Sequence, residues 1–109
     1  MEEKKPLAVK LESSDKYLRL LAGQPQTCGM RSGLVSLKPG EEIGEHSTDS
    51  REEALVILSG EAQICCVGSP ELSVSAATLV YIPPHTRHNV KNSGNSQLKY
   101  IYIVSPVAS

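Results

Sequence analysis

The sequence contains no tryptophan and no phenylalanine, and four tyrosines supply all of its aromatic side chains. It therefore offers no obvious stacking platform for bases or sugars. The 11 basic and 12 acidic residues are dispersed along 109 residues and give a net charge of −1. Neither a basic footprint for nucleic acid nor a polybasic patch for anionic lipid can be recognised. We expect no nucleic-acid partner and no membrane partner.

Long apolar runs are also missing from the sequence. None approaches the length of a membrane span, and the charged N-terminal stretch MEEKKPLAVKLESSDK lacks the apolar core of a signal peptide. We therefore predict a cytoplasmic protein. The patterns GxSxG, GxxxxGKS/T and GxGxxG do not occur, which leaves serine-hydrolase, P-loop and dinucleotide chemistry without support.

Cysteine is scarce and odd in number, with Cys28, Cys65 and Cys66 as its only copies. An odd count argues against a disulfide framework. The vicinal pair lies in a strand-like run, where neighbouring side chains point to opposite faces. Packing of one thiol against the core is a better interpretation than metal binding by the pair, and we assign the cysteines no function.

Short segments rich in Val, Ile, Leu and Tyr alternate with Gly and Pro, which is typical of an all-β protein with little helix. The segments cover residues 17–23, 33–38, 53–60, 61–68, 77–83, 88–92 and 97–104. Residues 13–21 have a plausible helix cap but are equally compatible with a strand. Nothing divides the chain, so we predict one domain over residues 13–109, preceded by a flexible segment over residues 1–12.

Two runs of the sequence carry spaced residues that resemble the two motifs of the cupin family. The first motif has a glycine, five residues, His-x-His, three or four residues, a glutamate, six residues and a glycine. The corresponding residues here are Gly40, His46, Thr48, Glu53 and Gly60. The second histidine of the motif is replaced by Thr48.

The second motif has a glycine, five residues, Pro-x-Gly, two residues, a histidine, three residues and an asparagine. Ala77, Pro83, His85, His88 and Asn92 occupy those places, so both motif glycines are replaced. The two runs together resemble a small single-domain cupin. That resemblance implies a double-stranded β-helix, or jelly-roll barrel.

The resemblance implies that His46, Glu53 and His88 are metal ligands. We expect a hairpin to bring His46 and Glu53 onto one interior face, with His88 coming from the opposing side. Two imidazoles and one carboxylate suit a divalent first-row metal ion such as Fe, Mn, Ni or Zn, whose identity the sequence does not determine. An empty polar site is the alternative, although an unpaired interior glutamate is costly to keep ionised.

Two further residues are minor candidates for the metal site. Thr48 replaces a ligand with a neutral hydroxyl, which either hydrogen-bonds a metal-bound water or belongs to a hairpin residue that faces solvent. His85 lies in a turn, where a loop role is the better interpretation. Asn92 reads better as a strand-end residue than as a partner of Glu53.

The resemblance implies a metal-binding protein with a small-molecule ligand, and an enzyme of the dioxygenase or isomerase kind on a small polar or anionic substrate. A non-catalytic binding or sensor barrel and a metal-free structural dimer stay open as alternatives. Arg31 and Arg51 either reach the mouth of the barrel and bind a carboxylate or phosphate or, as the default interpretation, are solvated on turns. We interpret Tyr100 and Tyr102 as packing residues. A homodimer is expected, because the run Lys99–Val104 has hydrophobic residues on both strand faces, and one face needs cover outside the barrel.

Overall fold

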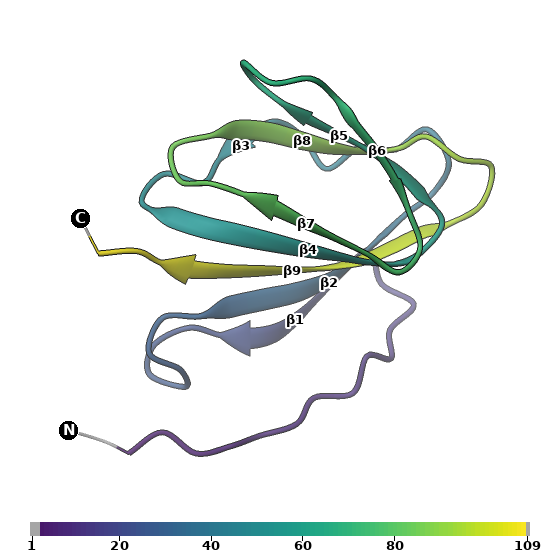
Figure 1. Cartoon of the computed structure of the whole chain (residues 1–109). Coiled ribbons are helices and arrows are strands. Elements are labelled where there is room, and N and C mark those ends of the chain that lie inside the picture. Colours follow the sequence, from purple (N-terminus) through teal and green to yellow (C-terminus); the bar gives the residue numbers. More distant parts are fainter. Residues whose placement is uncertain (1–2, 109) are drawn as a thin grey trace.

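The computed structural model describes residues 3–108, in which the chain forms nine antiparallel β-strands and no helix (Figure 1). This confirms the all-β prediction. Across that range no helix exists that is long and apolar enough to cross a membrane.

The strands form two sheets that face each other as the layers of a double-stranded β-helix (Figure 1). The five-stranded sheet has the order β1 (Tyr17–Ala22), β2 (Arg31–Leu37), β9 (Leu98–Pro106), β4 (Arg51–Ser59) and β7 (Thr78–Ile82). The four-stranded sheet has the order β3 (His46–Ser47), β8 (Arg87–Asn92), β5 (Glu61–Cys66) and β6 (Leu72–Ser75). The predicted jelly-roll barrel is therefore confirmed.

Each of the seven predicted segments overlaps one strand, and the ambiguous residues 13–21 contribute to β1 rather than to a helix. Strand β6 was not predicted. Its sequence, LSVS, has two serines and only two apolar residues, and it lies at the edge of its sheet. The proposed boundary between a flexible N-terminal segment and the domain stays a prediction.

The hydrophobic core fills one end of the barrel, and polar residues take over toward the other end. Strand β4 shows the change along its inward face, which runs from Ile57 and Leu55, both fully buried, to Glu53 and Arg51. The core consists of side chains from both sheets: Val35, Leu37, Leu55, Ile57, Ala62, Ile64, Val80, Ile82, Val90, Leu98 and Tyr100. The polar end of the barrel is its mouth. The inward-facing side chains there lie outside the hydrophobic core and are available for a functional site.

The vicinal cysteines occupy opposite faces of β5, as predicted. Cys66 packs against the core, while the Cys65 thiol donates to Oε1 of Glu71 at 3.2 Å. Burial raises the pKa of both thiols. Raised pKa values leave both groups as poor nucleophiles and poor ligands.

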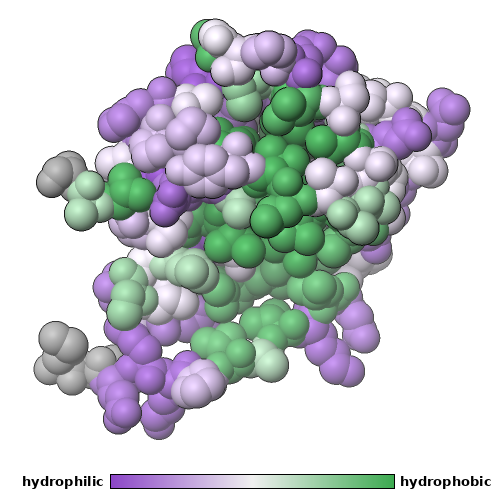
Figure 2. All heavy atoms as spheres, in the orientation of Figure 1, coloured by the Kyte–Doolittle hydropathy of each residue, from purple (hydrophilic) through white to green (hydrophobic). Residues whose placement is uncertain are grey.

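The outer face of the five-stranded sheet carries an apolar row across its full width. The strand registers align Leu79, Val56, Ile101, Leu34 and Leu18 in one row from β7 to β1. Figure 2 shows hydrophobic atoms gathered over the middle of the view, where β4, β7 and β9 lie in Figure 1. Leu79 is 71% exposed and Tyr81 is 59% exposed. Large apolar patches of this kind commonly mark interaction surfaces.

Two residues that replace motif glycines keep the backbone conformation that glycine favours. Ala77 has φ of 63° and His85 has φ of 54°. The left-handed region brings Cβ too close to the following carbonyl oxygen, which costs roughly 1–2 kcal/mol for a residue with a side chain. The turns have therefore been retained although the glycines have been lost.

Ala77→Gly is expected to stabilise the protein, because it relieves that contact at an exposed position. Glycine also gives the unfolded chain more freedom, so the net gain in the free energy of unfolding should be about 0.5–1 kcal/mol. Urea denaturation can measure it. Ala76→Gly is the matched control, since Ala76 does not have a positive φ and glycine there should be neutral or destabilising. A destabilised Ala77→Gly would contradict the strain assigned to this turn.

Candidate metal centre

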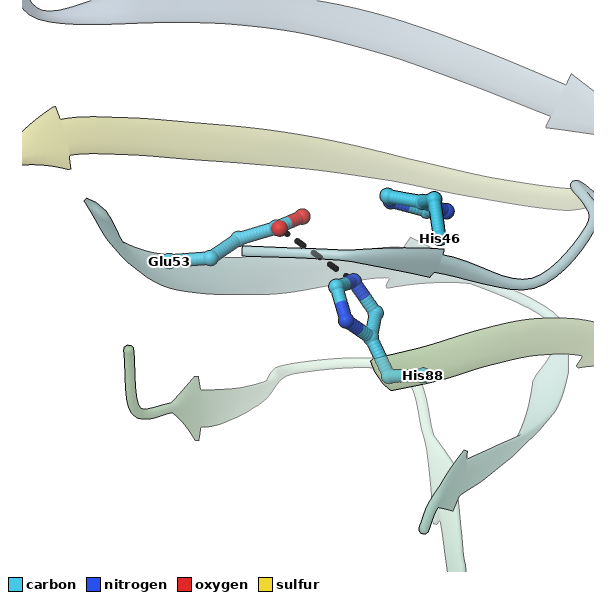
Figure 3. Close-up of side chains that lie close together, drawn as sticks. All are labelled: His46, Glu53 and His88. Carbon is cyan, nitrogen blue, oxygen red and sulfur yellow. Dashed lines mark ion pairs between the residues drawn. The ribbon is translucent and has the colours of Figure 1, made fainter. Parts of the chain in front are cut away.

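His46, Glu53 and His88 converge at the mouth of the barrel (Figure 3). Each offers one ligand atom, and these atoms all lie within 4.8 Å of one another. His46 opens β3 and His88 lies in β8, both in the four-stranded sheet, whereas Glu53 comes from β4 in the facing sheet. The site therefore spans the two sheets.

The expected arrangement of these residues is wrong in one respect. His46 does not share a face with Glu53 against an opposing His88. Instead His46 and His88 are direct partners in the β3–β8 register, with ring centroids 4.3 Å apart. The reason is that β3 has only two residues and pairs with β8, so the turn after it carries the chain from one sheet to the other rather than closing a hairpin with β4.

Backbone carbonyls orient both imidazoles. Nδ1 of His46 lies 3.0 Å from the oxygen of Gly44, and Nδ1 of His88 lies 3.1 Å from the oxygen of Thr86. A carbonyl can only accept, so each Nδ1 carries a proton and donates it. In the neutral rings this leaves the lone pair on Nε2, and such a partner on the second ring nitrogen is the usual support of a metal-binding histidine.

Nε2 of His88 is a buried polar atom without a hydrogen-bond partner among residues 3–108. It lies 3.3 Å from Oε1 of Glu53, whose side chain is 7% exposed. A lone pair facing a carboxylate at this distance is unfavourable unless a positive charge lies between or beside the two groups. Either a proton on His88 or a metal cation meets that requirement.

The three residues fit a divalent first-row metal ion. Metal bonds to nitrogen and oxygen of about 2.0–2.2 Å place two ligand atoms of one ion no more than about 4.4 Å apart. The observed spread of 4.8 Å is close to that limit, and small side-chain rotations would close it. The donor set of two imidazoles and one carboxylate is one that such ions prefer.

Thr48, at the place of the missing histidine, is buried rather than solvent-facing. Its hydroxyl donates to the oxygen of Pro83 at 2.7 Å and accepts from the backbone N–H of Thr86 at 3.0 Å. The solvent-facing interpretation is therefore wrong. Thr48 ties the turn after β3 to the loop that leads to His88, which helps to hold both imidazoles in place.

His85 and Asn92 form hydrogen bonds that hold turns in place. His85 is exposed, and its backbone N–H donates to the oxygen of Asp49 at 2.7 Å. Asn92 donates through Nδ2 to the oxygens of Leu37 and Ser96, both at 2.9 Å. Asn92 thus closes the turn after β8, as the preferred interpretation held.

A pocket of about 340 Å³ opens beside the candidate metal ligands. Its lining contains two arginines, three tyrosines and several aliphatic side chains: Tyr17, Arg31, Val35, Ile43, His46, Ser47, Thr48, Arg51, Glu53, Tyr100, Tyr102 and Val104. Arg31 and Arg51 reach the mouth, as one of the two interpretations of these arginines held, although Arg31 stays exposed. The tyrosines, interpreted as packing residues, also line the pocket. Arg51 and Glu53 are two residues apart and share a strand face.

The fold and site define a double-sheeted barrel with a His, His, Glu group at its mouth. A family model described as the cupin domain matches residues 33–104. The chain belongs to this family.

Several known proteins are similar to the chain. Polyketide synthase CurC of Streptomyces cyaneus is 30% identical over 87 residues, which cover 77% of this chain and 56% of that protein. Mannose-1-phosphate guanylyltransferase RfbM of Salmonella typhimurium is 35% identical over 71 residues, covering 65% of this chain and 15% of that protein. The chain thus spans little more than half of the first relative and a small part of the second.

Solved structures support the fold. The crystal structure of a Bacillus halodurans protein superimposes with a TM-score of 0.81 at 23% identity, covering 96% of this chain and 84% of that one. The cupin domain of Schizosaccharomyces pombe Cnp3 superimposes with a TM-score of 0.76 at 17% identity, covering 92% and 70%. At these identities the likeness concerns the barrel alone.

Proposed function

We propose that this protein uses His46, Glu53 and His88 to bind a divalent first-row metal ion, and that it acts on a small polar or anionic molecule in the adjoining pocket. The observation that carries the proposal is the buried Nε2 of His88, which faces the Glu53 carboxylate without a hydrogen bond. A cation at this position would satisfy both groups. Fe, Mn, Ni and Zn all suit the donor set.

The chain's own residues would prepare the site for chemistry. A bound ion would supply a Lewis-acidic centre of residual charge about +1. The carbonyls of Gly44 and Thr86 hold the imidazoles in one tautomer, and Ile43, Val35 and Val104 supply apolar side chains to the pocket wall. This arrangement supports an enzyme of the dioxygenase or isomerase kind, and the relative named a polyketide synthase protein supports a role in small-molecule metabolism.

Metal analysis of the protein purified without a histidine tag tests the proposal. One first-row ion per site, retained on desalting and removed by chelator, is the expected result. Turnover of a pocket ligand in the metal-loaded protein would favour the enzyme over a binding or sensor barrel. Failure to take up Fe, Mn, Ni or Zn under separate supplementation would refute the metal site.

We also propose a homodimer in which the apolar outer face of the five-stranded sheet packs against a second copy. The row from Leu79 to Leu18 is apolar throughout. Leu34 in this row is already buried, so a second copy would chiefly cover Leu79, Val56 and Ile101, which are exposed or half-buried. The dimer would leave the pocket open, because the pocket lies on the inner side of the same sheet. Cytoplasmic location is likewise part of the proposal.

Light scattering is expected to give twice the chain mass of 11.7 kDa at micromolar concentration. Leu79→Lys should shift the protein to monomer, because it places a charge in the proposed contact at its most exposed apolar residue, on the edge strand β7. Leu72→Lys is the matched control, since Leu72 is a 46% exposed leucine of the other sheet and should leave the dimer intact. A monodisperse monomer for the unmodified chain would contradict the proposal.

A further inference from the structure

We infer that the pocket binds a small carboxylic acid with a flat apolar body, and that Arg31 and Arg51 hold the carboxylate. The inference rests on the proposed small-molecule site and narrows its ligand to one chemical class. It concerns residues outside the three candidate metal ligands.

The strand registers place the two arginines around one point of the inner face. Arg31 on β2 pairs with Val104 on β9, and Val104 pairs with Glu53 on β4. These three residues therefore share a face, in one row across the sheet. Arg51 lies two residues before Glu53, which puts it on the same face and nearer the rim of the mouth. Both arginines line the pocket, one on each side of β9.

Neither guanidinium group forms an ion pair or hydrogen bond with another residue of the described range, 3–108. Other cationic side chains of the protein do have acidic partners, for example Arg87 with Glu45 at 3.0 Å. Two guanidinium groups and the Glu53 carboxylate give this part of the pocket a charge of +1. A planar, bidentate fork is well matched to a carboxylate.

Gly23 has no side chain, which leaves space for the side chain of Arg31 to lie against it. A Cβ at Gly23 would stand 2.9 Å from Cγ and 3.2 Å from Cδ of Arg31, so the stem of the arginine lies directly against the glycine. Gly23 is buried and has φ of 81°. The stem of Arg31 is thus packed along part of its length instead of being free in solvent.

The other residues that line the pocket favour a ligand with an apolar body. Tyr102 lies over Gly33, where a Cβ would come within 2.6–2.8 Å of its ring and hydroxyl. Tyr17, Val35 and Val104 complete a surface of rings and aliphatic groups. A ligand with only charged groups would leave this surface in contact with water, whereas a flat apolar body would cover it.

Calorimetry on the metal-free protein in chelator, with benzoate as the probe, tests the inference independently of the metal site. Benzamide has the same ring without the charge and should bind at least about tenfold more weakly. Arg31→Gln and Arg51→Gln should each weaken benzoate by about tenfold or more. Arg19 is an arginine of β1 that does not line the pocket, and Arg19→Gln should leave the affinity for benzoate unchanged.

Gly33→Ala should also weaken the binding of benzoate, because the added methyl group pushes Tyr102 into the pocket. Circular dichroism checks that each variant is folded.

Several results would overturn the inference. Equal affinity for benzamide and benzoate would show that the pocket does not recognise a carboxylate. Unchanged benzoate affinity in both arginine variants would show that Arg31 and Arg51 do not bind the carboxylate. Tighter binding of succinate or inorganic phosphate than of benzoate would show that the pocket does not prefer a ligand with a flat apolar body. Absence of benzoate binding at millimolar concentration would reject the ligand class. Since no metal is present in these measurements, a failed metal site would leave them unaffected.

Discussion

His88→Ala is expected to lower the affinity for a divalent metal ion by at least about a hundredfold. Loss of a group that only orients a ligand already costs about 10–100-fold, and His88 would be a ligand itself. The substitution also removes the imidazole that pairs with His46 across β3 and β8. Competition with a chromogenic chelator measures the affinity, and elemental analysis measures the occupancy.

The control for this experiment is His85→Ala. His85 is an exposed histidine three positions earlier, outside the group of convergent ligand atoms, so its removal should leave metal affinity unchanged. If His46→Ala and His88→Ala both kept full metal occupancy with the fold intact, the assignment of the site would be wrong.

Glu53→Gln is expected to abolish tight metal binding and, at the same time, to stabilise the metal-free protein at pH 8. The amide loses the negative charge that a metal needs but can donate to Nε2 of His88, which lacks a partner in the described part of the chain. One such hydrogen bond contributes about 1 kcal/mol, which corresponds to a rise in melting temperature of roughly 4–8 °C for a domain of this size. Opposite effects on affinity and stability would identify a residue kept for function.

The pH dependence of the metal-free protein sharpens this prediction. Burial alone lowers the pKa of His88, but the Glu53 side chain and the Thr86 carbonyl together outweigh burial, so the pKa lies above its ordinary value of 6.5. A raised histidine pKa adds stability that is complete below the unfolded value and is lost as pH rises through the folded value. The advantage of Glu53→Gln should therefore be large at pH 8 and small or reversed at pH 5.5.

Thermal unfolding in chelator at the two pH values makes the comparison. Glu52→Gln is the matched control, because Glu52 is the adjacent residue and only accepts a hydrogen bond from the Tyr81 hydroxyl, at 2.8 Å. An amide oxygen can still accept that bond. A Glu53→Gln variant that is less stable than the wild type at pH 8, or that retains tight metal binding, would contradict the prediction.

The fold could be predicted from the sequence because its signal is local and repeated. Short β-rich segments between turn residues mark seven of the nine strands, and two motifs at the right spacing indicate the barrel. Strand β6, with four residues, was not predicted, and the strand expected to end at His46 is instead the two-residue β3, which begins there. Pairing with neighbours, rather than their own composition, makes these segments extended.

The candidate site was predicted less completely, since spacing along the chain does not determine which strand lies beside which. His46, Glu53 and His88 do converge, but the pairing of His46 with His88 depends on the sheet change after residue 47. The partners of the Thr48 hydroxyl lie 35 and 38 positions away in the sequence. Arg31 is drawn into the pocket wall by the register of β2 with β9, which no local pattern encodes.

The two glycines behind the pocket wall imply that the proposed ligand preference could be altered without changing any group that would touch a ligand. Gly33 and Gly23 make room for the side chains of Tyr102 on β9 and Arg31 on β2, since a single methyl group at either glycine would collide with the side chain in front of it. A library restricted to small residues at position 33 would vary the depth of the pocket while sparing the three ligand atoms. Relatives that have exchanged substrates are then expected to differ at such supporting positions as often as at the contact residues themselves.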